Sequence, residues 1–181
     1  DRIKEGRKPK TVWMDPKYDA SSHGTMLLQK ILGKRKTFDY PKLLYAVKDL
    51  LEIGLKGKKN AIILDFFAGS GTTGHATLEL NNEDGGQRNF ILCTNNESGI
   101  SEDVCHPRIE KVIKGYSYSR KNIQGLGGNL KYFKTSFVPA EPTDKNKIAL
   151  TEKITEMLCI KENTFEEVKS EKRYKIFRNV K

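Results

Sequence analysis

The sequence predicts an α/β fold in which a mostly parallel sheet is flanked by helices. The first observation is the short, continuous apolar run A-I-I-L-D-F-F at 61–67, which is typical of a strand buried on both faces. The second is the glycine-rich turn that follows it, with a helical stretch at 72–80. The third is another apolar run, N-F-I-L-C-T at 89–94, after turn-forming residues at 81–87. Together they make one βαβ unit, for which a right-handed crossover is expected.

Two helices are expected before this unit. Apolar residues at 25–32 follow helical spacing, and Gly33 can end that helix. Pro41 can occupy the first turn of the second helix, because its missing N–H is not needed there. That helix should end near Gly54. Its predicted buried face comprises Leu43, Leu44, Val47, Leu50 and Leu51.

Further elements are expected after the unit. A helix is predicted at 107–114, with Ile109, Val112 and Ile113 facing inward. The glycine-rich segment 124–128 should form a turn before a strand at 129–135. A helix at about 147–159 and a strand at 174–177 complete the prediction.

Composition narrows the class of protein. The chain has 181 residues, with 33 Lys and Arg against 23 Asp and Glu, for a net charge of +10. This excess favours a polyanionic partner because neutralised phosphates release counterions, although a solvated lysine surface would have the same charge. No apolar run approaches the roughly 20 residues of a membrane helix, so we expect a cytoplasmic protein without a membrane partner.

The cysteines predict neither disulfides nor a metal centre. Cys93, Cys105 and Cys159 are an odd number, widely spaced and without a C-x-x-C pair. His106 beside Cys105 adds a second candidate ligand, but a zinc site needs a further pair. We therefore expect reduced thiols, with Cys93 and Cys159 buried, and no metal site.

The segment D-F-F-A-G-S-G-T-T at 65–73 carries the strongest signal of function. Glycines at the carboxyl end of a parallel strand let the backbone approach a ligand, and the next helix points its free N–H groups at the same crevice. We expect Gly69 and Gly71 to lack side chains because a ligand lies against the backbone there. Glu97, after the second strand, can accept hydrogen bonds from both hydroxyls of an adenosine ribose. These residues predict a nucleoside-cofactor site.

A nicotinamide or flavin enzyme is the main alternative, since Gly69, Gly71 and Gly74 also satisfy G-x-G-x-x-G. Asp65 counts against it, because a carboxylate before the turn would repel a pyrophosphate. The interval from Gly69 to Glu97 also exceeds the roughly 20 residues of a dinucleotide fold. In addition, a helix precedes the first strand, and no G-K-[ST] follows the glycines as a Walker phosphate loop requires.

Three boxes in order resemble a known family: F-D-Y-P-K at 38–42, D-F-F-A-G-S-G-T-T-G-H-A at 65–76 and L-N-N-E-D-G-G-Q-R-N-F-I-L at 80–92. They are similar to the Mod subunits of Type III restriction–modification systems, which are beta-class DNA adenine-N6 methyltransferases. The similarity extends from T-V-W at 11–13 to about Val138. It implies part of a Rossmann-like methyltransferase fold that binds S-adenosyl-L-methionine. It also implies double-stranded DNA as substrate, with a restriction subunit and a second methyltransferase copy as candidate partners.

The resemblance assigns roles to nine positions. Three flank the cofactor from the segment before the first strand: Phe38, Tyr40 and Lys42. Five line its methionine half, with the acid near the amino group: Asp65, Phe67, Gly69, Gly71 and Thr72. Glu97 holds the ribose. Core packing is the alternative for Phe38 and Phe67, and a solvated helix end is the alternative for Lys42.

The family attacks the base from an Asp-Pro-Pro-Tyr motif, which D-P-K-Y at 15–18 resembles. We reject this match because a buried strand should precede the motif, whereas only Val12, Trp13 and Met14 are apolar there. We therefore expect no catalytic residue in this chain. Because it begins Asp-Arg-Ile-Lys rather than with Met, we expect a piece of a longer protein.

The resemblance also suggests a division of the chain. Residues 1–36 would be a connection after a target-recognition region, 37–138 the cofactor-binding part, and 139–181 a C-terminal helical extension. Two other functions stay open: an NAD-dependent oxidoreductase, which would bind NAD instead, and a non-catalytic nucleic-acid-binding module, which would bind DNA and ignore S-adenosylmethionine. Adenine as the target base rests on the resemblance alone.

Overall fold

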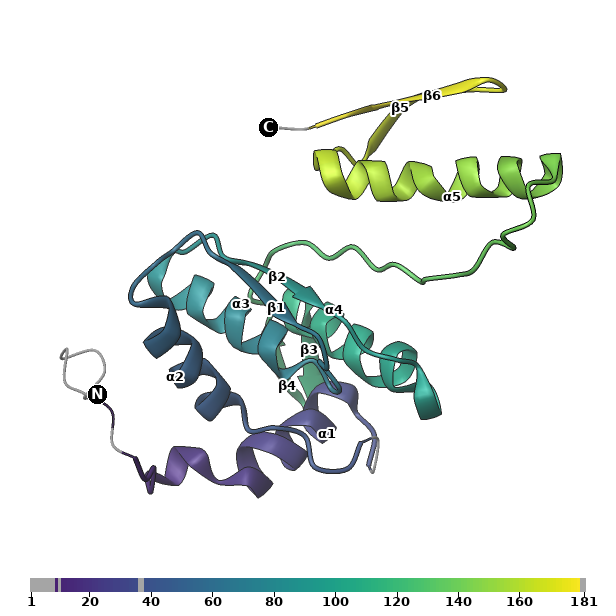
Figure 1. Ribbon diagram of the computed structural model, residues 1–181. Helices are drawn as coiled ribbons and strands as arrows, with labels where there is room; N and C mark the ends of the chain where they lie inside the picture. The colour runs from purple at the N-terminus through teal and green to yellow at the C-terminus, as the bar shows by residue number, and fades with distance from the viewer. Residues whose placement is uncertain (1–8, 10, 36–37, 180–181) are drawn as a thin grey trace. The chain divides into compact units, whose positions relative to one another are not determined.

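A computed structural model describes residues 9, 11–35 and 38–179 (Figure 1). The chain divides into two units, 1–132 and 133–181. The first contains a 3-10 turn at Pro16–Tyr18, π-helical turns at Ser21–Met26 and Ile100–Cys105, a 3-10 turn at Glu97–Gly99, and the elements α1 (Leu27–Leu32), α2 (Leu44–Leu55), β1 (Ile62–Asp65), α3 (Thr72–Asp84), β2 (Asn89–Leu92), α4 (His106–Lys114), β3 (Gly115–Tyr118) and β4 (Lys121–Gln124). The second contains α5 (Asp144–Glu162), β5 (Glu166–Glu171) and β6 (Tyr174–Arg178).

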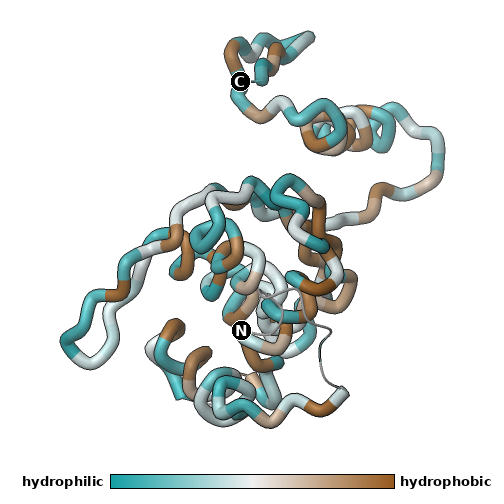
Figure 2. The backbone as a smooth tube through the Cα atoms, turned by 90° about the vertical axis from the view of Figure 1, so that its left-hand side faces the viewer, coloured by the Kyte–Doolittle hydropathy of each residue, from teal (hydrophilic) through white to brown (hydrophobic). Residues whose placement is uncertain are grey.

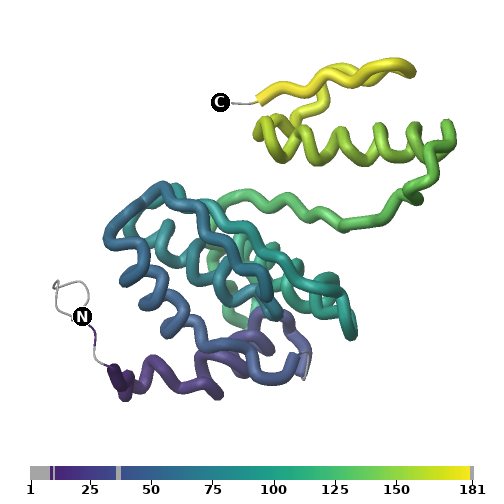
Figure 3. The backbone as a smooth tube through the Cα atoms, viewed as in Figure 1, coloured from purple at the N-terminus to yellow at the C-terminus, as the bar shows by residue number. Residues whose placement is uncertain are grey.

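The predicted βαβ unit is confirmed. Strands β1 and β2 pair in parallel, from Ile62 opposite Asn89 to Asp65 opposite Leu92, and α3 connects them. Helix α3 lies beside α2 and also packs against α4 and β2 (Figure 3). Gly74 permits this close approach, since a Cβ there would lie 2.9 Å from side-chain carbons of both Leu92 and Ile109.

The α/β class is confirmed, but a mostly parallel sheet is not observed. In the described residues each sheet has two strands, and only β1–β2 is parallel; β3–β4 and β5–β6 are antiparallel hairpins. The mixed composition follows from two local hairpins that the apolar pattern did not indicate. The β3–β4 hairpin turns at Ser119 and Arg120, whose φ angles of 47° and 63° fit the mirror-image turns that match strand twist.

The expected burial of β1 on both faces is wrong. Ile63 is 7% exposed, whereas Ile62 and Leu64 are 71% and 58% exposed. Successive side chains of a strand point to opposite faces, so α3 and its neighbours cover only the face that holds Ile63. On β2, Ile91 is likewise exposed. One apolar face of this strand pair is therefore open in the described residues.

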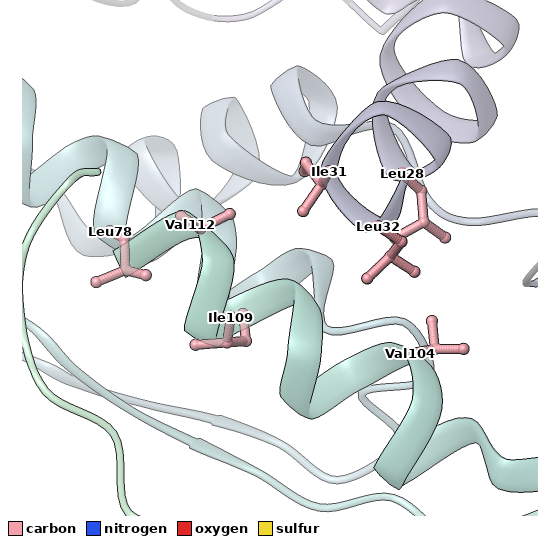
Figure 4. Close-up of a cluster of buried hydrophobic side chains, with 7 residues drawn as sticks. All are labelled: Leu28, Ile31, Leu32, Leu78, Val104, Ile109 and Val112. Atoms are coloured by element: carbon pink, nitrogen blue, oxygen red, sulfur yellow. The ribbon is translucent and has the colours of Figure 1, made fainter. Parts of the chain in front are cut away.

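The core is helical. It joins α1, α3, α4 and the π-helical turn before α4, with partly buried side chains such as Phe38, Phe90 and Leu92 packed against it. Figure 4 shows its seven central side chains: Leu28, Ile31, Leu32, Leu78, Val104, Ile109 and Val112. Ile109 and Val112 thus face inward as predicted, and Ile113 is half-buried.

Helix α2 departs most from its predicted form. It begins at Leu44, after an extended Leu43, so Pro41 is not in its first turn. It ends at Leu55, which confirms the predicted end near Gly54, and Lys56 is its left-handed C-cap. Of the predicted buried face, Leu44 is buried, Leu50 is exposed and the other three are half-buried. Two charged residues of α2, Lys48 and Asp49, are buried instead.

Partners on neighbouring elements explain these buried charges. Lys48 Nζ lies 2.5 Å from Glu83 Oε1 on α3. The Asp49 carboxylate accepts a hydrogen bond from the Tyr18 hydroxyl and lies 2.7 Å from Lys17 Nζ. Buried charges are tolerated where they are paired, so apolar periodicity alone misplaced the inward face.

Other boundaries also differ from prediction. The helix at 25–32 is confirmed as α1 and ends at Gly33 (φ 72°), and the helix at 107–114 is confirmed as α4. Helix α3 continues to Asp84, so the turn before β2 is shorter than 81–87. The predicted strand at 129–135 is wrong, because residues 125–139 form no regular element.

The second unit contains a helix and a hairpin. The predicted helix and final strand are confirmed as α5 and β6, whereas β5 was not predicted. Helix α5 carries apolar and polar residues along its length (Figure 2), and Cys159 is its buried residue. All three cysteines are free; Cys105 is buried as well, but Cys93 is half-buried rather than buried. Among the described helices none combines the length and apolar character needed to cross a membrane.

Candidate cofactor-binding site

A cavity of about 420 Å³ opens at the carboxyl ends of β1 and β2. Both strands run in the same direction, so the residues that follow each of them meet at one edge of the sheet, where open α/β sheets bind ligands. The walls are mostly apolar, with the polar groups Thr94 and Asn95 after β2. The lining residues are Phe38, Phe66, Phe67, Gly69, Cys93, Thr94, Asn95 and Ile100.

Three of the nine predicted residues line this cavity: Phe38, Phe67 and Gly69. The Phe67 side chain is 91% exposed, which excludes core packing as its role in the described residues. Phe38 packs against the core and also faces Gly69, where an added Cβ would lie 3.4 Å from the Phe38 ring. Gly69 has a φ of 50°, in the left-handed region that glycine adopts readily. Gly69 and Phe38 therefore form a narrow part of the cavity.

Asp65 ends β1 beside the cavity but does not line it. Its Oδ1 accepts a hydrogen bond from the Phe67 backbone N–H at 3.1 Å, and its Oδ2 accepts one from the Thr73 hydroxyl at 2.5 Å. These bonds orient the carboxylate between the turn and the first residues of α3. The carboxylate is half-buried, so part of its surface remains available to a cationic group.

Gly71 and Thr72 lie behind the cavity wall. A Cβ on Gly71 would lie 3.0 Å from Cys105 Sγ and 3.5 Å from Ile109 Cδ1. A ligand against the Gly71 backbone stays a prediction, because protein packing and a φ of 78° already require a glycine at this position. Thr72 is buried, and its hydroxyl oxygen lies 3.3 Å from the Lys42 carbonyl oxygen, to which it donates.

The rest of the 38–42 box approaches the turn through its backbone. Tyr40 is exposed and has a φ of 56°, and the Lys42 side chain is also exposed. Neither side chain lines the cavity. Lys42 precedes α2 rather than lying within it, and its carbonyl provides the link to Thr72.

Glu97 is exposed at the start of a 3-10 turn and does not line the cavity. Its Oε2 accepts a hydrogen bond from Asn95 Nδ2 at 3.4 Å, so the acid is joined to a residue that does line it. Sequence reasoning missed Asn95 and the other lining residues Phe66, Cys93, Thr94 and Ile100. Their position directly after the two strands is a signal that could have found all but Ile100.

A buried polar cluster lies behind the glycine turn. The Arg108 side chain is fully buried, and burial lowers its pKa to about 10. Its Nη1 donates to Thr72 Oγ1 at 2.8 Å, Ser70 Oγ at 3.1 Å and the Ser70 carbonyl at 3.3 Å. Its Nη2 lies 3.4 Å from His75 Nδ1. Burial also lowers the pKa of His75, an effect that the neighbouring Glu79 opposes.

Two other candidate chemistries lack support in the geometry. Burial raises the pKa of the Cys105 thiol to about 11, so it is protonated at neutral pH and unsuited to nucleophilic attack. No set of three or more His, Cys, Asp or Glu side chains within the described residues is placed to hold a metal ion.

The D-P-K-Y segment forms a 3-10 turn at Pro16–Tyr18 rather than following a strand. Tyr18 donates its hydroxyl to Asp49, and its ring lies 5.1 Å from the Trp13 ring. Asp15 accepts a hydrogen bond from the Lys17 backbone N–H at 2.9 Å. None of these residues lines the cavity. Tyr18 and Lys17 attach this segment to α2 through Asp49.

A family model described as DNA methylase matches residues 2–103, more than half of the chain. The chain is a member of the DNA methylase family. The matched range contains the 38–42 box, the glycine turn, both strands, Glu97 and every residue that lines the cavity.

Three methylases have sequences similar to parts of this chain. The EcoPI Mod subunit of a Type III restriction–modification enzyme, from Escherichia phage P1, is 36% identical over 134 residues, or 67% of this chain and 20% of its own length. The StyLTI Mod subunit of Salmonella typhimurium is 54% identical over 57 residues, or 32% of this chain and 8% of its own. The Type II methyltransferase M.KpnI of Klebsiella pneumoniae is 37% identical over 115 residues, or 64% of this chain and 27% of its own length. The chain thus spans about a quarter or less of these methylases.

Proposed function

We propose that this chain is the cofactor-binding portion of a DNA adenine-N6 methyltransferase of a restriction–modification system. The substrate would be double-stranded DNA, and the cofactor S-adenosylmethionine. The cavity at the carboxyl ends of β1 and β2 carries this proposal, because it joins the 38–42 box to the glycine turn. Membership of the DNA methylase family and similarity to two Mod subunits support it.

The residues present fit this cofactor. Gly69 provides a space that a Cβ would fill, directly against the Phe38 ring. Phe38 and Phe67 offer apolar surface, while Asp65 offers a carboxylate for an amino group. Glu97, or Glu97 with Asn95, would accept hydrogen bonds from the ribose hydroxyls. When bound, the cofactor supplies a methyl group on a positively charged sulfur.

For Tyr40, Lys42, Gly71 and Thr72 we propose supporting roles. None lines the cavity, but Thr72 and the Lys42 carbonyl connect its two walls. The transfer itself depends mainly on holding the target amine in line with the methyl group. D-P-K-Y is engaged with Asp49, which supports our proposal that the residues contacting the base lie in another part of the protein.

We further propose that β1 and β2 belong to a larger, mostly parallel sheet of the Rossmann-like methyltransferase type. The open apolar face at Ile62, Leu64 and Ile91 supports this, because such sheets are normally covered on both faces. Residues 1–36, 37–138 and 139–181 would then be the connection, the cofactor-binding part and a C-terminal extension. The boundary at 36 and 37 lies outside the described residues. A restriction subunit and a second methyltransferase copy are the proposed partners beside DNA.

Calorimetry on the full-length protein tests the cofactor. We expect S-adenosylmethionine to bind, and Glu97→Ala to weaken binding by about 1.5–3 kcal/mol through the loss of charge-assisted hydrogen bonds. Glu110→Ala is a matched control, since Glu110 is a surface acid on α4 paired with Lys114. Unchanged affinity in Glu97→Ala would mean that the ribose is held elsewhere.

The same titration separates the alternatives. Binding of NAD without S-adenosylmethionine would identify an oxidoreductase. Binding of DNA with no affinity for S-adenosylmethionine would identify a non-catalytic nucleic-acid-binding module. Transfer of a labelled methyl group to adenine in duplex DNA would distinguish adenine from cytosine as the target base.

A further inference from the structure

Arg108 is a charged side chain that lies in the interior without a carboxylate partner among the described residues. Its Nε also has no hydrogen-bond partner there. Burying an arginine in this way is costly, so neighbouring groups must make the position favourable. Those groups are neutral oxygens and a ring nitrogen, and three of the four contacts are with Ser70 and Thr72 of the glycine turn.

The contacts with Ser70 control the orientation of one peptide group. Arg108 Nη1 donates to the Ser70 carbonyl at 3.3 Å, and the N–H of the same peptide unit, on Gly71, donates to the Ala68 carbonyl at 2.7 Å. Since the C=O and N–H of a trans peptide point in opposite directions, these two bonds hold the plane of that peptide from both sides. The turn that carries Gly69 is thereby fixed against α4.

The contact with Thr72 extends this support to the other wall of the cavity. Thr72 Oγ1 accepts from Arg108 Nη1 at 2.8 Å and donates to the Lys42 carbonyl at 3.3 Å. Lys42 belongs to the 38–42 box, whose Phe38 ring lies close to Gly69 in the cavity wall. One guanidinium on α4 therefore holds both segments that form the narrow part of the cavity.

Arg108 also lies next to the first residues of α3. The free N–H groups at a helix N-terminus carry partial positive charge, and Arg108 adds a full positive charge close to them. Asp65 is the acid at this end of α3, since its Oδ2 accepts a hydrogen bond from the Thr73 hydroxyl. Arg108 itself contacts no acid within the described residues, so its own charge favours an anionic group on the outer side of the turn. A carboxylate on the ligand would meet that requirement.

From these contacts we propose that Arg108 is a positioning residue for cofactor binding, which orients the glycine turn and the 38–42 box and favours a ligand that carries a carboxylate. This inference rests on the proposed function, since it concerns the same cavity. It adds a residue that lies outside all three sequence boxes and does not touch the cavity.

The test compares two ligands in the full-length protein by calorimetry. S-adenosylhomocysteine has the amino-acid carboxylate, whereas methylthioadenosine lacks the amino-acid portion. We expect Arg108→Met to weaken S-adenosylhomocysteine binding by about 10-fold or more, the usual effect of losing a charged hydrogen-bond donor, with less than about a 3-fold change for methylthioadenosine. Arg108→Lys, which keeps the charge but not the fork, should recover part of the loss.

Arg88→Met is the matched control. Arg88 is also buried and hydrogen-bonded, to Asp84 and the Lys58 carbonyl, but it precedes β2 at the end opposite the cavity. We expect both methionine variants to lower the melting temperature, and only Arg108→Met to change the ratio of the two affinities. A second pair, Thr72→Val and Thr72→Ser, tests the link to Lys42: the valine variant should weaken binding and the serine variant should retain it.

The outcomes are distinct. If the unaltered protein binds neither ligand, the proposed function fails. If it binds both, and folded Arg108→Met also binds both normally, the positioning role is refuted and Arg108 serves packing alone. A loss by the same factor for each ligand would refute the preference for a carboxylate. Titrations at a temperature well below every melting transition keep unfolded protein out of the comparison.

Discussion

Gly69 and Gly71 should respond differently to the same added methyl group. In Gly71→Ala the new Cβ would lie 3.0 Å from the buried Cys105 Sγ, at a φ of 78°. A left-handed backbone costs an L-residue about 1–2 kcal/mol, and crowding in a packed interior costs about 1–3 kcal/mol more. We therefore expect Gly71→Ala to lower the free energy of unfolding by about 2–5 kcal/mol. A value near 3 kcal/mol corresponds to a fall in melting temperature of about 6–12 °C for a domain of this size.

In Gly69→Ala the new Cβ would meet the Phe38 ring at 3.4 Å, an ordinary contact, on the cavity side of the turn. Only the backbone cost of about 1–2 kcal/mol should appear in stability. Cofactor affinity should fall instead, because the methyl group fills space that the ligand needs. Folded Gly71→Ala should bind the cofactor normally, and calorimetry with urea denaturation on the same samples measures both effects.

Gly85→Ala separates backbone strain from crowding. Gly85 has a φ of 66° and no heavy atom within 4 Å of an added Cβ, so its substitution has only the backbone cost. Adding Cys105→Ala to Gly71→Ala should restore about 1–2 kcal/mol, because it removes the sulfur that the new Cβ meets. If Gly71→Ala is no less stable than Gly85→Ala, or if the double variant restores nothing, the packing argument is refuted.

Two further predictions concern buried polar groups. Burial lowers the pKa of His75 below its ordinary value of 6.5, so the unfolded chain takes up a proton that the folded chain does not. The free energy of unfolding should then fall by up to about 1.4 kcal/mol per pH unit as the pH drops below about 6.5. His75→Gln should make this pH dependence shallower in urea titrations, and an unchanged pH dependence would contradict the role of His75. Tyr18→Phe removes the hydrogen bond to Asp49 and should cost about 1 kcal/mol of stability while methyl transfer by the full-length protein continues. Loss of transfer in that variant would instead make D-P-K-Y the motif that holds the base.

The sequence predicted the βαβ unit well because several local signals agree there. Apolar runs, a glycine turn with positive φ, and the spacing between them all describe contacts made within about 30 residues. The exposure of Ile62 and Leu64 could not be predicted in the same way, since it depends on what covers the second face of the sheet. The β3–β4 hairpin was missed because its strands are short and polar, and its turn carries Ser119 and Arg120 rather than glycine or asparagine.

The segments that carry the predicted site residues lie together in the structure, but only three of the nine side chains or glycines line the cavity. The resemblance indicated that the 38–42 box and the glycine turn meet, and Phe38 and Gly69 do face each other. It also placed a ligand against Gly71, which stays a prediction, and a glycine motif does not reveal which side of the turn each Cα–H faces. That direction follows from the turn's φ angles and from α4, an element more than 30 residues away.

Apolar periodicity failed to predict the burial of charged residues on α2 and at Arg108. A pattern of apolar residues treats Lys48, Asp49 and Arg108 as surface positions, yet all three are buried. Each is stabilised by polar groups distant in sequence: Glu83 for Lys48, and Tyr18 for Asp49. For Arg108 the distant partners are backbone and hydroxyl groups of the glycine turn rather than an acid.

This difference in partners has a consequence for function. The two charges of a buried ion pair compensate each other, and such a pair can often be replaced by apolar residues with little loss of stability. The guanidinium of Arg108 is different, because the oxygen atoms that accept its hydrogen bonds belong to the glycine turn. These bonds offset the cost of removing the charge from water only while the turn keeps its present geometry. Any movement of Ser70 or Thr72 that weakens those bonds leaves the charge uncompensated. We therefore expect the turn to keep its binding conformation in the ligand-free protein. Arg108→Met should increase the rate of hydrogen exchange at the turn's backbone amides when no ligand is present. Equal exchange rates in the variant and the unaltered protein would show that the turn keeps its shape without the guanidinium.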